Sequence, residues 1–261
     1  EEGCPLKTVE ISDSVELIII DTQWYLENWN NNPTINDHCP IKTRARFLEE
    51  LEGELKKAQS KRVILAMHHP MFTNGLHGGF FSAGKHLYPT QSNIPLPILG
   101  SLVAQIRTQG GISIQDRFNE RYNELMKRLE TLCSEYDNIV VASGHEHTLE
   151  DIDHNRIKQI VSGSGAKEAV VALNNDGLFA YGKQGFAQLD IFEDGSVWVE
   201  FYGEKQGEPQ LLYRKEVLPK NRDLFDISTL PNLFPEQTEA SIYSVDETEK
   251  SGFHELLLGE R

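Results

Sequence analysis

The sequence holds only three cysteines, and no two of them are close together. Cys4, Cys39 and Cys133 lack the Cys-x-x-Cys spacing of a zinc knot, and their odd number leaves at least one thiol unpaired. Cys133 falls on an apolar helical face, which predicts a buried thiol. Cys4 and Cys39 could pair in an oxidising compartment, although nothing in the sequence requires it.

Long apolar runs are also missing. No stretch approaches the roughly 20 apolar residues that a membrane-spanning helix needs. The chain has no secretion signal and begins with Glu1 instead of methionine. We interpret that start as a processed chain or a piece of a longer protein, so the missing signal assigns no compartment.

Positive charge is scarce. The 25 Lys and Arg residues face 40 Asp and Glu residues, which gives a formal net charge of −15. This balance argues against a nucleic-acid partner, which needs basic patches, and against polybasic docking onto anionic lipid. A phosphate-bearing substrate stays open if bound metal ions make the local site cationic. The hydrophobic content of 39% is ordinary for a soluble globular protein with a real core.

Continuous apolar runs alternate with amphipathic segments in the first part of the chain. The runs predict buried strands and the segments, with apolar residues at helical spacing, predict helices. The predicted strands are Val15–Ile20, Val63–Met67 and Ile139–Ala142. The predicted helices, which alternate with them along the chain, are Thr43–Ala58 and about Asp116–Tyr136. This alternation predicts an α/β fold with a layered sheet. Trp24–Pro40 and the Gly- and Pro-rich Phe72–Gly111 are predicted loops, and a loop as long as the second is usually functional or mobile.

The pattern changes after residue 142. Ile157–Val161 predicts a further strand, and Phe186–Phe192 and Val197–Tyr202 flank Asp194-Gly195, which favours a hairpin. From about Pro219 the sequence becomes polar and acidic, as in a linker or an extended arm. We therefore predict a domain over 1–218 and a linker or acidic tail over 219–261.

Histidines directly follow two of the buried strands. His68-His69 comes after the second strand and His145-Glu146-His147 after the third. The carboxyl ends of strands are where α/β sheets build their sites. A lone histidine there is more often structural, but two such clusters favour metal ligation. An extended backbone would point His145 and His147 to one side and Glu146 away, and by the same alternation only one of His68 and His69 into the site.

These segments resemble a known superfamily. VILAMHHPMF at 63–72 and VVASGHEHTLE at 140–150 are similar to calcineurin-like metallophosphoesterases, and DTQW at 21–24 is most similar to their purple acid phosphatase branch. The resemblance covers about residues 15–202. It implies an α/β/β/α sandwich, with this chain as its C-terminal portion, and hydrolysis of phosphate esters by a metal-activated hydroxide. The last residues, 250–261, resemble a junction in some bacterial members where the domain precedes an outer-membrane β-barrel.

The resemblance also implies a division of roles among the histidines. His68 and His145 would bind one metal ion and His147 a second, with Fe, Mn or Zn as divalent or trivalent ions and two ions in the complete domain. His69 falls at a variable position of the family. We interpret it as a residue behind the ligands, or simply as one that points away.

Three further residues are weaker candidates for the site. Asp21 either orients a ligand histidine or caps a turn. His77 and His86 lie in the long loop, where they either line a substrate cleft or are ordinary surface histidines. Gly163-Ser164-Gly165 lacks the lysine of a phosphate-binding loop, and a plain turn is the simpler interpretation.

The family's other ligand motifs are missing from the sequence. Asp-x-His, Gly-Asp-x-x-Asp and Gly-Asn-His, which would supply the bridging carboxylate and the acid–base group, do not occur. No catalytic residue can therefore be assigned, and we expect this chain alone to be inactive, with its metal sites partial or empty. Two alternatives are a non-catalytic binding or assembly module and a single-zinc hydrolase with Glu146 or Asp21 as its base.

The missing motifs also bear on partners and location. Without upstream strands the central sheet would expose an edge, so we expect self-association through that edge. A phosphate ester is the expected substrate. The resemblance implies an extracytoplasmic protein, in the periplasm or at the cell surface.

Overall fold

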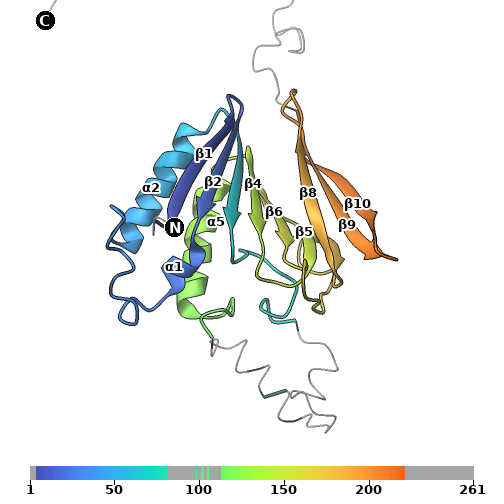
Figure 1. Cartoon of the computed structure of the whole chain (residues 1–261), viewed down its shortest axis with the longest axis horizontal. Helices are drawn as coiled ribbons and strands as arrows, with labels where there is room; N and C mark the ends of the chain where they lie inside the picture. The colour runs from blue at the N-terminus through green and yellow to red at the C-terminus, as the bar shows by residue number, and fades with distance from the viewer. Residues whose placement is uncertain (1–3, 81–97, 99–100, 103–104, 106–112, 221–261) are drawn as a thin grey trace, which may run out of the picture. The chain divides into compact units, whose positions relative to one another are not determined.

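The computed structural model describes residues 4–80, 98, 101–102, 105 and 113–220. Figure 1 shows the strands and helices of this part of the chain. In chain order they are β1 Leu6–Ser12, β2 Val15–Ile20, α1 Thr22–Leu26, α2 Arg44–Lys57, β3 Arg62–Met67, α5 Glu120–Ser134, β4 Ile139–Ser143, β5 Leu149–His154, β6 Ile157–Ser162, β7 Gly177–Tyr181, β8 Gly185–Ile191, β9 Val197–Lys205 and β10 Glu208–Leu218.

The strands form two sheets. Sheet A has the order β1-β2-β3-β4-β6-β5-β7, and sheet B has the order β10-β9-β8. Within sheet A the neighbours β2, β3, β4 and β6 are parallel. β1 joins β2 and β5 joins β6 antiparallel, and β7 pairs antiparallel with β5 at the far edge. A parallel core places the carboxyl ends of β3 and β4 at the same edge of the sheet.

Sheet A is covered on both faces. The helices α2 and α5 lie on one face and sheet B lies on the other (Figure 1). Successive residues of β4 show this directly, because Val141 packs in the cluster that contains the helices and Val140 in the cluster that contains sheet B. Strands buried on both faces need continuous apolar sequence, which is what the runs in β3 and β4 provide. In β2 only one face is buried, because Ile18 and Ile20 pack under the helices while Ile19 is exposed. The predicted layered α/β fold class is thereby confirmed.

Most of the predicted elements are found. The strands at 15–20, 63–67, 139–142 and 157–161 and the helix at 43–58 occur within a residue or two. The hairpin around Asp194-Gly195 is also found, and its second strand runs three residues further than predicted, to Lys205. The second helix begins at Glu120 instead of about Asp116, because the Asn119 side chain caps it. Trp24 is wrongly predicted as loop: it lies in α1, a short helix that the Asp21 side chain caps.

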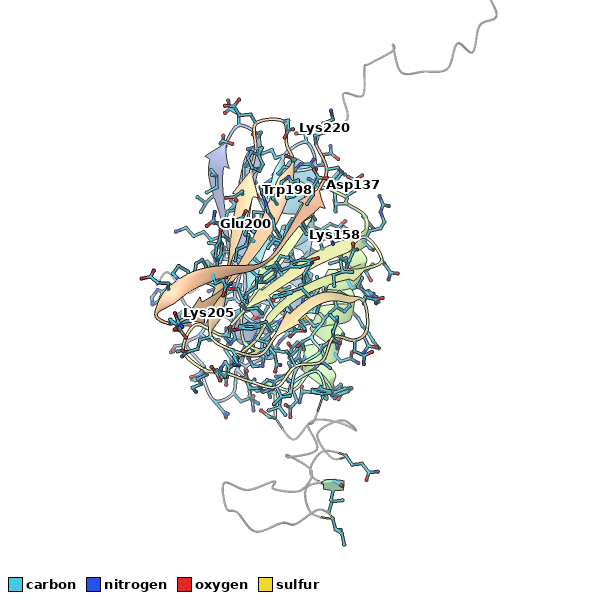
Figure 2. The ribbon with its side chains drawn as sticks, turned by 90° about the vertical axis from the view of Figure 1, so that its right-hand side faces the viewer. Asp137, Lys158, Trp198, Glu200, Lys205 and Lys220 are labelled. Atoms are coloured by element: carbon cyan, nitrogen blue, oxygen red, sulfur yellow. A yellow bond between two sulfur atoms is a disulfide. The ribbon has the colours of Figure 1, made fainter. Side chains whose placement is uncertain are left out.

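The outward face of sheet B carries large side chains. Along β9, the buried Val197, Val199 and Phe201 point toward sheet A, and the half-buried residues between them point outward. Figure 2 looks onto this face and labels Trp198 and Glu200 there. Sheet B therefore has a buried inner face and a more polar outer face.

A disulfide joins Cys4, just before β1, to Cys39, with the two Cα atoms 5.1 Å apart. Cys133 is a free, buried thiol on α5, as its position on the helix predicts. In the described ranges no helix is both long and apolar enough to span a membrane. The predicted tail lies almost wholly outside the described residues, and the 218/219 boundary stays a prediction.

Candidate metal centre

The register of β3 and β4 brings the two histidine segments together. Met67 pairs with Ser143 at the carboxyl ends of these neighbouring strands. One residue further on, the Gly144 backbone N–H donates to the His68 carbonyl oxygen at 3.1 Å. The chain then turns out of both strands, and the imidazoles that follow meet above the edge of sheet A.

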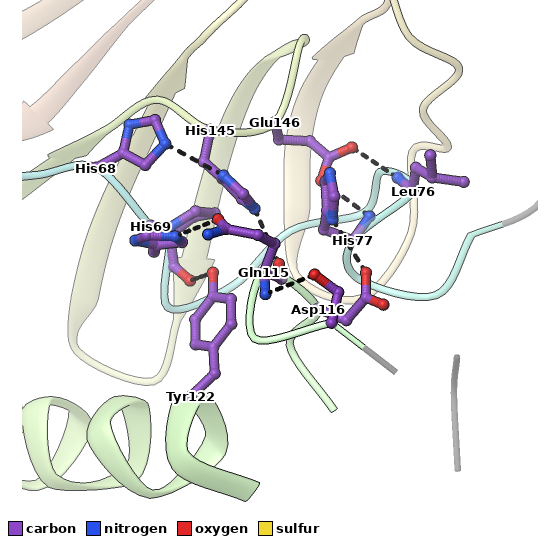
Figure 3. Close-up of polar contacts among 11 residues, drawn as sticks. His68, His69, Leu76, His77, Gln115, Asp116, Tyr122, His145 and Glu146 are labelled. Carbon is purple, nitrogen blue, oxygen red and sulfur yellow. Dashed lines mark hydrogen bonds and ion pairs between the residues drawn. The ribbon is translucent and has the colours of Figure 1, made fainter. Parts of the chain in front are cut away.

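Three imidazoles form what we call the histidine cluster: His68, His69 and His145. One ring nitrogen of each lies within 4.8 Å of the others (Figure 3). His68 Nε2 and His145 Nδ1 are 3.2 Å apart. Two imidazole nitrogens bound to one tetrahedral ion, each at about 2.0–2.1 Å from it, lie about 3.4 Å apart. The spacing of this pair therefore fits two ligands of a single metal ion.

His69 is held by the protein through both ring nitrogens. It is fully buried, its Nδ1 lies 2.7 Å from the Thr22 hydroxyl, and its Nε2 lies 2.7 Å from Gln115 Oε1. The Gln115 amide nitrogen donates to Gln23, so its oxygen accepts from His69 and Nε2 carries the proton. His69 would have to release one of these bonds to bind a metal.

His145 is positioned by an unusual backbone conformation. Its φ is 63°, in the left-handed region, and its Nε2 lies 2.9 Å from the Gln115 carbonyl oxygen. The expectation of an extended backbone through 145–147 is therefore wrong, because the chain turns at His145. His147 is not a member of the histidine cluster, and its role as a ligand stays a prediction.

Burial favours the neutral form of His69 and His145, while His68 is exposed at the edge of the cluster. Burial lowers the pKa of His69 to about 4 and that of His145 to about 3, and neighbouring histidines add to both shifts. The pKa of His68 is lowered too, by partial burial and by His147, against the opposing effect of Asp21. Neutral imidazole is the form that binds metals, so the cluster is ready to bind without losing a proton.

The weaker candidates have distinct surroundings. Asp21 accepts from the Trp24 backbone N–H at 3.0 Å as the cap of α1, and its charge also reaches His68. His77 stacks near His145, with ring centres 4.4 Å apart, and its Nδ1 lies 3.1 Å from Asp116 Oδ1. His86 lies outside the described residues.

Glu146 holds the loop that carries Leu76 and His77. Its side chain is buried and accepts backbone N–H bonds from Leu76 at 2.7 Å and His77 at 3.0 Å (Figure 3). A Cβ added at Gly75 would lie 2.3 Å from Glu146 Oε1, so any other residue there would displace the Glu146 side chain. Both carboxylate oxygens are occupied, which argues against Glu146 as the base of a single-zinc hydrolase.

Several contributors to the site carry no local sequence signal. Thr22 and Gln115, which bracket His69, are 47 and 46 residues away from it in the chain. Tyr122 on α5 packs edge-on to His69 and donates its hydroxyl to the Pro70 carbonyl oxygen at 2.8 Å. Pairing over such distances can be found only once the fold is known.

The donor set of the cluster fits one ion better than two. Among the residues that the structure describes, no carboxylate joins the three imidazoles. Two dications at about 3.5–4 Å need a bridging anion to offset their repulsion, and neutral imidazoles do not supply it. The described residues can therefore hold one ion through His68 and His145, with His69 behind them.

Comparison with known proteins supports the fold. No protein-family model matches the sequence, and no curated protein matches it. Two solved structures are similar to it. One is PhoD, with a TM-score of 0.50 and 11% identity over 84% of this chain and 44% of that one. The other is GAP50, described as the anchor in the inner membrane complex of Plasmodium, with a TM-score of 0.48 and 19% identity over 84% of this chain and 54% of that one.

The chain thus spans about half the length of these two structures. At 11% identity, the likeness to PhoD shows a shared fold and nothing about chemistry. Together with the large mixed sheet, it confirms the metallophosphoesterase-like fold class that the sequence predicts.

Proposed function

We propose that this chain supplies the histidine part of the metal centre of a metallophosphoesterase, an enzyme that hydrolyses phosphate esters. One observation carries the proposal: His68 Nε2 and His145 Nδ1 lie 3.2 Å apart where two neighbouring strands end. The Gly-His-x-His segment and the PhoD-like fold support it. A bound ion would supply a hydroxide at neutral pH by lowering the pKa of water.

In this proposal the residues have separate tasks. His68 and His145 bind the ion, and His147 belongs to a second ion in the complete domain. His69, fixed between Thr22 and Gln115, sets the position of its neighbour His68. With no carboxylate in the cluster, this chain alone would bind one ion weakly and would not turn over substrate.

Metal titration tests the binding step. We expect one Co²⁺ or Zn²⁺ ion per chain by calorimetry, with affinity reduced at least about tenfold by His68→Ala or His145→Ala, because each removes an imidazole ligand. His38→Ala, at an exposed position in another loop, is the matched control. Equal affinity in all four proteins would contradict the assignment.

Hydrolysis tests the catalytic step. In the full-length protein, His145→Ala or His147→Ala should abolish metal-dependent cleavage of an aryl phosphate, while His38→Ala should not. Retained full activity in either of the first two variants would exclude the proposed centre.

A second candidate function is a non-catalytic binding or assembly module. It is favoured by the hydrogen bonds that the histidines make without an ion. His69 is bonded to Thr22 and Gln115, and His145 to the Gln115 carbonyl oxygen. Elemental analysis of the purified chain separates the two functions. One metal ion per chain that is lost in His68→Ala and His145→Ala would refute the module, and an apo-protein with no measurable affinity for Co²⁺ would favour it.

We further propose an extracytoplasmic location and self-association. The Cys4–Cys39 disulfide supports the first, because such bonds persist in oxidising compartments. The edge of β2 is not free for the second, because β1 covers it. Self-association is instead supported by β10, an edge strand of sheet B on which Leu211 and Leu212 are exposed. Light scattering at high concentration should report a dimer or larger species, and a clean monomer would count against association.

A further inference from the structure

A pocket of about 700 Å³ lies between α5 and the segments around β5 and β7. None of the three cluster histidines lines it. Its walls come from the loop after β3, the residues before α5 and its first turns, the end of β5, and the residues just before β7. Among them are Phe72, Arg117, Phe118, Lys127, His154 and Asp176. Its size is typical of sites for small molecules.

The pocket has unpaired positive charge. Arg117 donates from Nε to the Met71 carbonyl oxygen and from Nη1 to Asn123 Oδ1, both at 2.8 Å, which leaves Nη2 for a further acceptor. Neither Arg117 nor Lys127 forms an ion pair within the described part of the chain. The one carboxylate of the lining, Asp176, is already bonded to His154 Nδ1 at 2.7 Å. In a chain of net charge −15, such a wall favours an anion.

The rest of the wall is mixed: it carries the polar Thr73, Asn74, Asn123 and Asn175, and apolar surface from Met71, Phe72, Phe118 and Ile152. Phe118 is 38% exposed, a large fraction for an aromatic ring, whereas Met71 and Ile152, also in the lining, are buried. Phe72 packs against the His154 ring with their centres 4.4 Å apart. A flat apolar body would find contact area here, while its charged end meets Arg117 and Lys127.

We propose that this pocket binds a small organic anion with a planar apolar body, such as an aryl carboxylate. The anionic group accepts from Arg117 Nη2 and from the Lys127 ammonium, and the ring lies against Phe72 and Phe118. Arg117 is pre-organised by its bonds to Met71 and Asn123, so little freedom is lost when it takes a third acceptor. This site is separate from the metal centre and does not depend on the proposed function.

Calorimetry with two matched probes tests the site. 2-Naphthoate and 2-naphthamide share one ring system and differ in charge, and EDTA keeps metal ions away from the carboxylate. We expect 2-naphthoate to bind with a Kd of about 1 mM or better, as its size allows, and 2-naphthamide at least about tenfold more weakly, because it loses the charge-assisted bonds.

Variants on exposed positions locate the probe. Lys127→Gln should weaken 2-naphthoate about three- to tenfold and leave 2-naphthamide unchanged, whereas Phe118→Ala should weaken both probes alike. Arg128→Gln removes one positive charge from the next residue of the same helix, whose side chain is paired with Glu124, and is the matched control. Arg117→Lys keeps the charge, loses the planar fork and should also weaken 2-naphthoate.

Three results would overturn the proposal. Equal affinity for the two probes would show an apolar cleft with no selection for charge. An equal loss of affinity for 2-naphthoate in Lys127→Gln and Arg128→Gln would show that the probe senses only the net charge of the helix. Loss of 2-naphthoate binding in His68→Ala, with Lys127→Gln unaffected, would place the probe at the histidine cluster instead.

Discussion

Glu146 shows how much of this site depends on one buried side chain. It lies between two candidate metal ligands in sequence, yet it faces away from them and binds the backbone of Leu76 and His77. A carboxylate that accepts two backbone bonds in a buried place is costly to remove, because both donors are then left without a partner.

We therefore expect Glu146→Ala to destabilise the protein by about 2–3 kcal/mol and to free the loop it holds. Hydrogen exchange of the Leu76 and His77 amides should become faster, beyond the change at amides of α2. In Glu146→Gln, which keeps one acceptor oxygen, the stability and the two exchange rates should lie between those of the wild type and of Glu146→Ala. Unchanged protection at both amides in Glu146→Ala would contradict this role.

The buried thiol of Cys133 makes the stability of the protein depend on pH in the alkaline range. Burial raises the pKa of this thiol to about 12 from its ordinary 9.0. The folded-state pKa is the higher one, so the contribution of Cys133 to stability is fully present below pH 9 and is lost as the pH rises toward 12. Over that window the loss is about 1.4 kcal/mol per pH unit.

The test compares how steeply the unfolding free energy depends on pH in the wild type and in Cys133→Ala. The unfolding free energy should fall more steeply between pH 9 and 11 in the wild type than in Cys133→Ala, as measured with urea at each pH. The variant retains the other buried groups, such as Tyr122, and serves as the reference. Identical slopes would show that the thiol does not stay protonated in the folded protein.

At the scale of elements, apolar runs predict β3, β4 and β6 because those strands are buried on both faces. The run in β2 also predicts its strand, although Ile19 there is exposed. β5 escapes prediction because its buried positions include the carboxylates Glu150 and Asp151, whose partners come from distant segments. β10 escapes because it is exposed along most of its length and interrupted by irregularities in register.

The site, like the strands, could be predicted from the sequence only in part. The strand-end positions of the histidines are enough to predict that the two segments meet, and they do. The backbone turn at His145, with its φ of 63°, gives no sequence signal, so the orientation of the imidazoles could not be predicted. Strand alternation holds only while the chain remains a strand.

Gly163, just after β6, tests the contact between neighbouring strand ends. A Cβ added there would lie 2.0 Å from the Glu146 carbonyl oxygen, a backbone atom that cannot move without shifting the whole segment. Gly163→Ala should cost at least about 2 kcal/mol of stability. Gly165→Ala meets nothing within 4 Å and is the matched control, expected within about 0.5 kcal/mol of wild type. Similar melting temperatures for both variants would show that the strand ends are not packed this closely.

At the scale of the whole molecule, the Cys4–Cys39 disulfide closes a segment that contains β1, β2 and α1, with a sequence separation of 35. A loop of this length is expected to contribute about 3–4 kcal/mol, largely by restricting the unfolded chain. Reduction should lower the unfolding free energy by that amount, measured with and without a phosphine reductant. Cys4→Ser/Cys39→Ser should match the reduced wild type and ignore the reductant, and a wild type indifferent to reductant would refute the estimate.

The same disulfide has a mechanical consequence. When the chain is pulled from its two ends, force enters at the N-terminus, crosses from Cys4 to Cys39 through the sulfur atoms and bypasses everything between them. Even after complete unfolding, about 35 residues stay slack inside the covalent ring, and the stretched length is shorter by about 120 Å. The edge strand β1, which ordinary fraying would release first, is thereby shielded from tension applied at the end of the chain.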